Sequence, residues 1–264
     1  MTSSGGTLDG VTVNGNLDLT EANNANANVV DGLTLNGTAF LGAASGATYG
    51  QLLFTARDFT STEALSGTGT IVFGTYGANN ALSVGGDLLS LTIGPSITIR
   101  GSSGTINSLF NRSVINQGTI SADGSGGAAG GTITINPTTF TNQGTLRATN
   151  GEVLNLSNLS PNAGVIHIGI GSVINVTGNF TNVSSGSVVI DIGGTSTSQY
   201  GRLQVTGTAT LAGTLQVDLV NGFSPAAGNS FQVMTFSSEV GTFSSVLGWP
   251  YNVAYDPSDL TLSR

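Results

Sequence analysis

Apolar and polar residues alternate in short runs along most of this chain. The clearest runs lie at residues 8–19, 132–135, 165–170, 188–192 and 211–219, and each is bounded by Gly, Asn or Asp. A period of two residues predicts β-strands with one buried face, and the bounding residues predict turns between them. Apolar residues at helical spacing are almost absent. We expect a loop at the Asn- and Ala-rich residues 21–28 and a single helical turn at residues 60–65.

The predicted strands repeat in sequence. Residues 8–15 (LDGVTVNG) return 22 positions later as residues 30–37 (VDGLTLNG), and residues 115–120 (INQGTI) return 26 positions later as residues 141–146 (TNQGTL). A further triplet, Gly-Thr-Ile/Leu, starts at Gly6, Gly69, Gly104, Gly118, Gly131, Gly144 and Gly213. Repeats of this length, built from short strands, are typical of stacked coils.

The repeats predict an all-β fold, a right-handed parallel β-helix (solenoid) of about nine to eleven coils with roughly 20 to 26 residues each. Strand spacing of about 4.8 Å gives a rod roughly 45 to 55 Å long. Val, Ile and Leu should stack inward, while Gly and Asn occupy corners that often require a positive φ. A β-sandwich also has many short strands, but it does not predict repeated sequence at equal positions.

Polar residues that repeat one coil apart indicate the corners of the solenoid. Stacked Asn side chains can form amide ladders, which satisfy backbone groups that a sharp corner leaves unpaired. Two Asp residues at equivalent positions each precede Gly, as in an ordinary Asp-Gly turn. The predicted corner and ladder residues are Asn14 with Asn36, Asn116 with Asn142, and Asp9 with Asp31.

The C-terminal part of the chain is rich in aromatic residues. We divide the chain into β-helix coils at residues 1–192 and final coils with a capping segment at residues 193–264. The end of a solenoid exposes strand edges and an open core, which bulky side chains in an irregular final segment would cover. The predicted C-terminal cap residues are Phe223, Phe231, Phe236, Phe243, Trp249 and Tyr251.

Composition narrows the classes of function. Only 8% of residues are charged while 38% are apolar, which argues against a disordered chain. Lys is absent and the net charge is −8, which disfavours binding to nucleic acid or to an anionic membrane surface. Cys is also absent, which excludes disulfides, thiolate metal sites and Cys nucleophiles.

Targeting signals are not evident in the sequence. No stretch approaches the ~20 apolar residues of a membrane span. Met1 is not followed by the basic and then apolar segments of a signal peptide. We therefore expect the chain to be an excerpt from a longer exported precursor, and a soluble cytoplasmic protein is the alternative.

Candidate catalytic residues are few. His167 is the only histidine, and its alternation with isoleucines predicts a solvated outward position on a strand. One His without Cys excludes a zinc site with several His ligands. Asp9 and Asp31 would suit a polysaccharide hydrolase, but each is better explained as a turn residue. The Arg residues are scattered along the chain, whereas a polysaccharide lyase typically needs basic residues against its acidic substrate.

Calcium binding and ice binding are also disfavoured. The Gly-rich segment 121–131 holds one Asp where calcium requires several oxygen ligands, so we expect a flexible corner loop. The Thr-x-Thr steps are not spaced by a single coil length, so no flat threonine array is expected. We predict no catalytic residue, no cofactor and no metal ligand.

One segment carries a family resemblance. The pattern Tyr200-Gly-x-Leu-x-Val-x-Gly-x-Ala-x-Leu-x-Gly-Thr-Leu-x-Val217 is followed by Asn221-Gly-Phe-x-Pro225, a strand at 231–236 and Gly241-Thr-Phe243. This segment resembles the C-terminal β-helix end of bacterial autotransporter-like passengers and filamentous-haemagglutinin-like surface adhesins. The match covers the C-terminal quarter of the chain, and the upstream coils match only in style. The resemblance implies secretion, a long β-helical stalk and an adhesive or scaffolding role, and it supplies no catalytic residues.

We therefore predict a non-enzymatic, extracellular structural or adhesive β-solenoid segment of a secreted bacterial surface protein, with self-assembly into fibres as a further expectation. The expected partners are a host or neighbouring cell surface, glycans or other copies of the chain, without nucleic-acid binding or membrane insertion. The alternatives are a carbohydrate-active β-helix, either hydrolase or lyase, and a glycan- or ice-binding module. Adhesion rests on the resemblance, because fold alone does not prove function.

Overall fold

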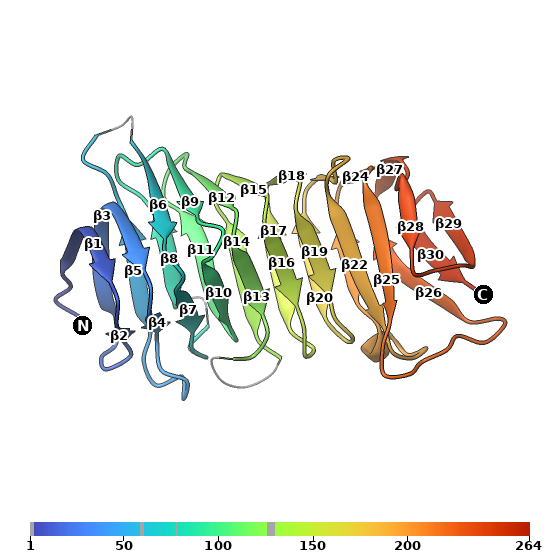
Figure 1. Cartoon of the computed structure of the whole chain (residues 1–264), viewed down its shortest axis with the longest axis horizontal. Coiled ribbons are helices and arrows are strands. Elements are labelled where there is room, and N and C mark those ends of the chain that lie inside the picture. The colour runs from blue at the N-terminus through green and yellow to red at the C-terminus, as the bar shows by residue number, and fades with distance from the viewer. Residues whose placement is uncertain (1–2, 59–60, 78, 126–129) are drawn as a thin grey trace.

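The computed structural model describes residues 3–58, 61–77, 79–125 and 130–264. Within these residues the chain forms β-strands and one short helix, η1(Thr197–Gln199), and the strands stack side by side along the long axis of the molecule (Figure 1). Strands one coil apart pair in parallel, which confirms the predicted all-β parallel solenoid. The first strand lies at one end of the stack and the last strands lie at the other.

Each coil contributes strands to three faces, which we call A, B and C. Two long strands, β1(Thr7–Val13) and β3(Ala25–Leu35), serve both face A and face B, so these faces share one sheet. Face A continues through β5(Gly50–Phe54), β8(Ala81–Val84), β11(Gly104–Ser108), β14(Thr132–Asn136), β17(Val153–Ser157), β20(Val173–Thr177), β23(Arg202–Val205) and β26(Ser230–Thr235).

Faces B and C complete each coil. Face B continues through β6(Thr62–Ser66), β9(Ser90–Ile93), β12(Ser113–Asn116), β15(Thr139–Asn142), β18(Leu159–Asn162), β21(Phe180–Thr181), β24(Thr208–Leu211) and β27(Ser238–Gly241). Face C is a separate sheet, which among the described residues has ten strands. They are β2(Leu17–Leu19), β4(Thr38–Leu41), β7(Thr70–Phe73), β10(Thr98–Gly101), β13(Thr119–Ala122), β16(Thr145–Ala148), β19(Val165–Ile168), β22(Ser187–Ile192), β25(Thr214–Leu219) and β28(Ser245–Leu247).

The register on face C gives the length of each coil. The shortest coil runs from Thr145 to its partner Val165, and the longest runs from Thr38 to its partner Thr70. The longest coils therefore exceed the predicted range, which is too narrow. They carry their extra residues in the corners, because the strands themselves stay in register.

The predicted repeat offsets match strand register. Val11 pairs with Leu33, and Asn116 pairs with Asn142, with the same offsets as the two sequence repeats. Both sequence offsets are therefore confirmed as the lengths of single coils.

The Gly-Thr triplets mark two different corners. Those at Gly104 and Gly131 precede or begin strands of face A, whereas those at Gly118 and Gly144 precede strands of face C. The spacing between successive triplets is therefore the distance between two faces of a coil. A Cβ on Gly144 would lie 2.1 Å from the carbonyl oxygen of Gly118, so this corner requires glycine. Thr145 N donates to the same oxygen at 2.8 Å.

Inward-facing apolar side chains form a continuous column inside the three faces. On face C, Ile99, Ile120 and Leu146 pair in register and are fully buried. Burying one such side chain stabilises the fold by about 1.5–3 kcal/mol. The buried apolar residues from Leu17 to Leu262 belong to one cluster, so each coil packs on the coils before and after it.

An antiparallel hairpin covers the edge of face A at the C-terminal end. β30(Asp259–Ser263) pairs antiparallel with β26 on one side and with β29(Asn252–Asp256) on the other. The Phe231 ring packs edge-to-face against Tyr200 and Trp249, with ring centroids 5.6 and 5.7 Å apart. An aromatic-rich cap is thus present. Of the six predicted residues only Phe231 lies in a strand and the other five lie between strands, while the regular β29–β30 hairpin is an addition that was not predicted.

The predicted cap residues differ in depth. Phe231 is fully buried, and Trp249 is 5% exposed while Tyr251 is 36% exposed. Phe223 is partly buried and packs against the core. Phe236 and Phe243 are also buried. Tyr251 lies at the outer side of the cluster, where the Arg264 guanidinium stands 4.9 Å from its ring centroid.

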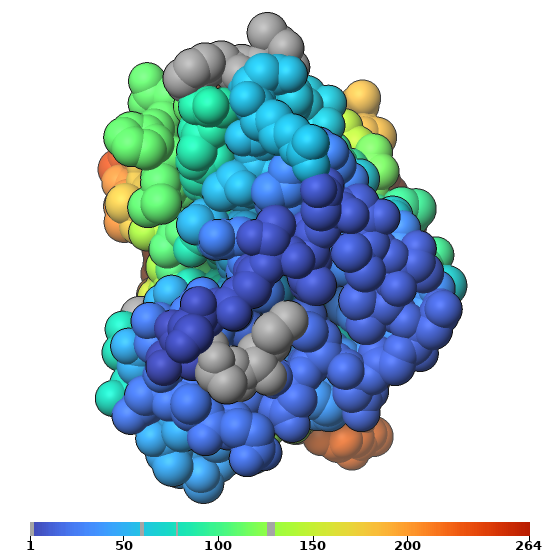
Figure 2. All heavy atoms as spheres, turned by 90° about the vertical axis from the view of Figure 1, so that its left-hand side faces the viewer, coloured from blue at the N-terminus to red at the C-terminus, as the bar shows by residue number. Residues whose placement is uncertain are grey.

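The N-terminal end is built differently. β1 and β2 are the first strands of their faces, and no described strand pairs with their outer edges. Figure 2 looks onto this end, whose surface is formed by residues of the first coils, drawn in blue. At the other end the antiparallel hairpin covers face A alone, and β27 and β28, the last strands of faces B and C, have no described strand on their outer edges.

Three local expectations need correction or fall outside the described residues. The loop expected at residues 21–28 is wrong in its second half, because Ala25 and Ala27 are fully buried residues of β3. The helical turn expected at residues 60–65 is wrong, because β6 begins at Thr62, while residue 60 lies outside the described part. Residues 126–129 of the expected corner loop 121–131 also lie outside it. In the described part of the chain, no helix has the length and apolar character needed to cross a membrane.

Candidate functional site

A ladder of buried amides runs along the corner between faces B and C. Nδ2 of Asn116 donates to Oδ1 of Asn142 at 2.8 Å, and Asn142 donates in the same way to Asn162 at 2.7 Å. Asn162 then donates to Asn182 at 2.6 Å, and all four residues are fully buried. The amides also donate to nearby backbone carbonyls, as Asn142 Nδ2 does to Gly144 O at 3.3 Å. The ladder thus satisfies carbonyls that the corner leaves unpaired.

Only the first two members of this ladder, Asn116 and Asn142, were predicted from the sequence. The prediction missed Asn162 and Asn182, which follow Asn142 in the next two coils. The signal for Asn162 is the Asn-x-Gly triplet that it shares with Asn116 and Asn142. Asn182 lacks this signal, because the next Gly after it is Gly186.

The other predicted asparagine pair lies at a different depth. Nδ2 of Asn36 donates to Oδ1 of Asn14 at 2.8 Å, and both side chains are exposed. In these first coils the inward position of face B is occupied by Val11 and Leu33. The two predicted Asn pairs therefore occupy the same corner of the coil, one outside and one inside.

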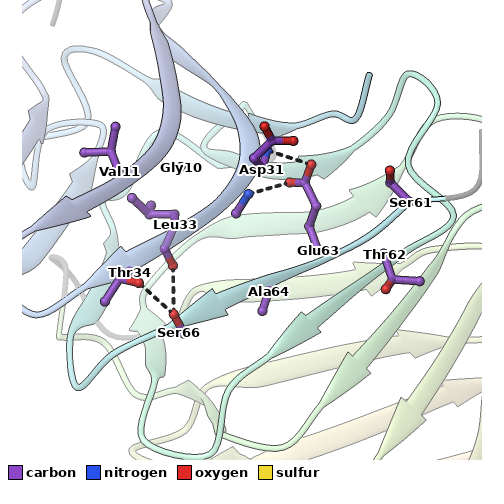
Figure 3. Close-up of a pocket in the computed structure, with 11 residues that line it drawn as sticks. Gly10, Val11, Asp31, Leu33, Thr34, Ser61, Thr62, Glu63, Ala64 and Ser66 are labelled. Atoms are coloured by element: carbon purple, nitrogen blue, oxygen red, sulfur yellow. Dashed lines mark hydrogen bonds between the residues drawn. The ribbon is translucent and has the colours of Figure 1, made fainter. Parts of the chain in front are cut away.

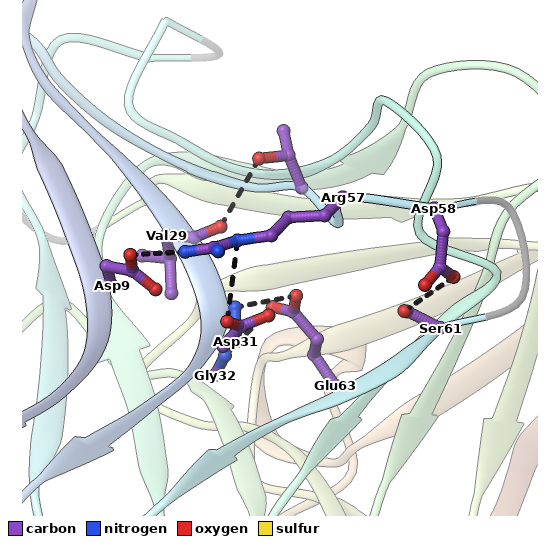
Figure 4. A network of polar contacts seen from close by, with 9 residues as sticks. Asp9, Val29, Asp31, Gly32, Arg57, Asp58, Ser61 and Glu63 are labelled. Carbon is purple, nitrogen blue, oxygen red and sulfur yellow. Dashed lines mark hydrogen bonds and ion pairs between the residues drawn. The ribbon is translucent and has the colours of Figure 1, made fainter.

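Carboxylates gather at the corner between faces A and B near the N-terminal end. Arg57 forms ion pairs with Asp9 and with Asp31, the latter at 3.5 Å (Figure 4). Asp9 and Asp31 are not at equivalent positions, because Asp9 pairs with Val30 and the register shifts after it. Their Asp-Gly steps lie inside β1 and β3, where positive φ angles such as +59° at Asp31 bend the strand.

Glu63, in the next coil, forms hydrogen bonds to the backbone of this bend. Its Oε1 accepts from Asp31 N at 2.9 Å and its Oε2 accepts from Gly32 N at 3.1 Å (Figure 3). Burial raises the pKa of the Glu63 carboxyl, while these two hydrogen bonds oppose the rise and the charge of Asp31 adds to it. Beside it lies a hollow of about 300 Å³, where the hydroxyls of Thr34 and Ser66 lie 3.0 Å apart.

The polar groups of this acidic corner are occupied by one another. Both oxygens of Glu63 are used by the backbone, and the two aspartates share one arginine. This arrangement holds the bent strands β1 and β3 against β6. A carboxylate tied to two backbone amides is poorly placed to act as an acid or a base on a ligand.

A second group of charged residues lies on face C, spread over β10 to β22. We define the face-C strip as Arg100, Ser121, Asp123, Arg147, His167 and Asp191. Arg100, Ser121, Arg147 and His167 follow one another in register on successive strands. Their neighbours along each strand are buried, so this row faces outward, as the alternation around His167 predicts. Arg100 and Arg147 are thus two coils apart, roughly 10 Å, and the expectation of scattered arginines is wrong for these two.

Two ion pairs flank the centre of the strip. Arg100 Nη2 lies 2.9 Å from Asp123 Oδ2, and His167 Nε2 lies 2.9 Å from Asp191 Oδ1. Arg147 lies between these pairs, is exposed, and has no hydrogen bond or ion pair with any described residue. Its guanidinium therefore keeps all of its donors for a ligand.

The strip surrounds a shallow hollow. The hollow has a volume of about 290 Å³, and Arg147, Asp123 and Asp191 line it. Thr149, Asn150 and Ile170 complete most of its wall. It offers a free cation on Arg147, a carboxylate acceptor on Asp191 and a small apolar surface within one site. Arg147 is without a described partner, whereas the charged groups of the acidic corner are paired with one another. We therefore take the face-C strip as the candidate functional site.

Threonines form a regular row beside the strip. Five consecutive strands of face C begin with a Thr in register: Thr38, Thr70, Thr98, Thr119 and Thr145. These threonines are one coil apart at each step, so the expectation that no regular threonine array forms is wrong for this row. The next outward row contains the arginines of the strip, so the surface is not a uniform array of hydroxyls.

The charged clusters do not have the form of a metal site. Among residues 3–58, 61–77, 79–125 and 130–264, no three His, Asp or Glu side chains lie close enough together to hold a metal ion. Comparison with known proteins found no matching family model, no matching curated protein and no matching solved structure.

Proposed function

We propose that this protein is a non-enzymatic structural and adhesive segment of a secreted bacterial surface protein. The β-solenoid provides a rod whose core needs no partner, and the outer faces are available for contact with other molecules. The proposed partners are a host or neighbouring cell surface, its glycans, or other copies of the chain. The proposed location is the cell exterior.

The gathering of charged groups on the face-C strip carries this proposal. The chain has only six arginines and one histidine, yet two of the arginines and the histidine fall on one row of one face. Core packing does not require them there, because their side chains point outward. An outward row of this kind fits a binding surface on a rigid rod.

Composition and sequence pattern support an extracellular setting. Absence of Cys allows export without disulfide formation, and the amide ladder stabilises the coils without a metal or cofactor. Residues 200–217 and the segments after them resemble the C-terminal β-helix end of surface adhesins. Both features suit a stalk that folds outside the cell.

An adhesion assay tests the proposal directly. Beads coated with the purified chain should bind to bacterial or host cells more than albumin-coated beads, and excess soluble chain should compete. Binding no greater than that of albumin-coated beads across a panel of cells and immobilised glycans contradicts the proposal.

Self-assembly is a separate part of the proposal. The outer edges of β1 and β2 at one end, and of β27 and β28 at the other, have no described partner strand, whereas the β29–β30 hairpin covers face A. We therefore propose that copies of the chain assemble end to end into fibres through these edges. Negative-stain electron microscopy with sedimentation velocity tests this part: fibres that lengthen as the concentration rises support it, and discrete short rods at every concentration contradict it.

A carbohydrate-active enzyme is the second candidate. The observation that favours it is the His167–Asp191 pair beside Arg147, since a histidine held by a carboxylate is a common general base. Incubation with a panel of polysaccharides should then release new reducing ends or unsaturated products. Products that disappear in His167→Ala would establish this second function, and intact polysaccharides throughout the panel would reject it.

A further inference from the structure

We infer that the hollow at Arg147 binds the carboxylate of an acidic saccharide, a sugar chain that contains uronic acids. The inference rests on the proposed adhesive function and names the ligand class of the same strip. It follows from three features, which are the free cation, the neighbouring acceptors and the net charge of the chain.

The free cation indicates an anionic group in the ligand. Arg147 is exposed at the hollow and has no described partner, whereas Arg100 is already paired with Asp123. The guanidinium can form two parallel hydrogen bonds to one carboxylate. Arg147 is therefore the cation of the strip that is both exposed and without a described partner.

The acceptors beside the cation indicate a ligand that also carries hydroxyls. Asp191 uses Oδ1 for His167, and its Oδ2 has no described partner. Asn150 and Thr149 add amide and hydroxyl groups to the wall of the hollow, and Ile170 adds apolar surface. A sugar ring matches this set, because its hydroxyls donate to carboxylates while its C–H groups pack on apolar side chains.

The overall charge argues against a more densely charged ligand. The chain carries a net charge of −8, and Asp123 and Asp191 stand on both sides of Arg147. A polyphosphate or nucleic acid would meet these carboxylates with closely spaced negative charges. A saccharide that places one carboxylate among several hydroxyls avoids this repulsion.

Calorimetric titration of the whole chain tests the inference. The probe is an aldouronic acid, a single glucuronic acid attached to a neutral xylo-oligosaccharide, with its methyl ester as the matched neutral ligand, in about 0.15 M salt. We expect binding of the acid form and at least tenfold weaker binding of the ester. Glucuronic acid monomer and acetate show whether the sugar chain, the single sugar or the carboxylate alone is recognised.

Variants of Arg147, compared with a control on face A, test whether the ligand binds at this hollow. Arg147→Gln should weaken binding of the acid form about 10- to 100-fold, since it removes a charge-assisted contact. Arg147→Lys should retain part of the affinity, because it keeps the charge but loses the paired geometry. Arg202→Gln is the control, since Arg202 lies on face A, and it should bind like the wild type. Circular dichroism confirms that all three variants fold.

Four results of these titrations would contradict binding of an acidic saccharide at Arg147. Equal binding by Arg147→Gln and wild type, preference for the neutral ester, acetate binding as tight as the oligosaccharide, or no binding up to millimolar oligosaccharide would each overturn it. Adhesion of coated beads that persists in Arg147→Gln overturns the inference while leaving the adhesive function standing. Absence of adhesion in the wild type is instead a failure of the proposed function.

Discussion

One inward row of face B changes character halfway along the rod. In the earlier coils it holds Val11, Leu33, Leu65 and Ile93, which pair in register from coil to coil. Ile93 then pairs with Asn116, and from there the row continues as the buried amide ladder. The same position in the same fold is therefore filled by apolar packing in the first coils and by hydrogen-bonded amides in the next four, after which buried Leu211 follows Asn182.

The boundary between the halves explains how a polar row is tolerated in the core. A buried amide is costly alone but stable when each neighbour supplies a partner. Asn116 stands at the boundary, and its Oδ1 is buried without a hydrogen-bond partner because the preceding residue of the row is Ile93. In this row each buried Asn therefore has at least one Asn neighbour with which it forms a hydrogen bond.

The largest expected effect comes from placing a lone Asn in the apolar half. Leu65→Asn loses a buried side chain between Leu33 and Ile93 and leaves an amide without partners, so we expect a loss of roughly 4 kcal/mol in the free energy of unfolding. Ile93→Asn should cost about half as much, because its Nδ2 can donate to the free Oδ1 of Asn116. Urea unfolding of both variants measures the difference. Equal losses in the free energy of unfolding would show that a neighbouring amide does not reduce the cost of burying an Asn in this row.

The next effect comes from interrupting the amide half. Asn142→Leu removes the donor to Asn162 and the acceptor for Asn116, so we expect a loss of about 2–3 kcal/mol. The control is Asn36→Leu in the exposed pair, for which we expect a change within about 0.5 kcal/mol. Both are measured by urea unfolding, and a control as damaging as Asn142→Leu would contradict the role of burial.

A smaller effect is expected at the acidic corner of the apolar half. Arg57→Gln removes the ion pairs to Asp9 and Asp31, but all three side chains are more than half exposed. Such pairs contribute at most about 1 kcal/mol, and less at high salt. Thermal unfolding at low and high salt should show a small difference that shrinks as salt is added. A large loss that is independent of salt would mean that Arg57 has a packing role instead.

The smallest effect is a dependence on pH. Burial raises the pKa of the Glu63 and Glu152 carboxyls above their ordinary value of 4.5. The stability that these groups contribute is therefore full below the ordinary pKa and is lost as pH rises through the raised one. We expect a higher unfolding midpoint near pH 5 than at pH 7. Glu152→Gln should reduce the difference and the exposed control Glu21→Gln should leave it unchanged, so an unaltered pH dependence in Glu152→Gln would contradict this assignment.

The sequence predicted the parts of the fold that depend on repetition. Alternation and the two repeat offsets led directly to parallel coils, because each strand pairs with its own repeat. It did not predict the strand at Ala25 and Ala27, since small residues among asparagines lack the contrast that marks a buried face. Nor did it predict the hairpin β29–β30, because an antiparallel pair at the end carries no repeat.

The candidate site was predicted only in part. The outward position of His167 followed from local alternation, but the alignment of Arg100 with Arg147 depends on corner lengths that differ from coil to coil. A coil length that varies along the chain hides such rows until the register of each strand is known. The continuation of the ladder to Asn182 was missed because Asn182 lacks the Asn-x-Gly triplet of the earlier members.

The unequal corners have a consequence for how such a chain can evolve. Between faces A and B, seven residues separate Phe54 from Thr62 in one coil, while Asn158 alone separates Ser157 from Leu159 in another. The strands on either side remain stacked in both cases. Insertions and deletions at this corner are therefore compatible with an unchanged stack of strands. Loops of different length can be added or removed there one coil at a time without a change in the buried column.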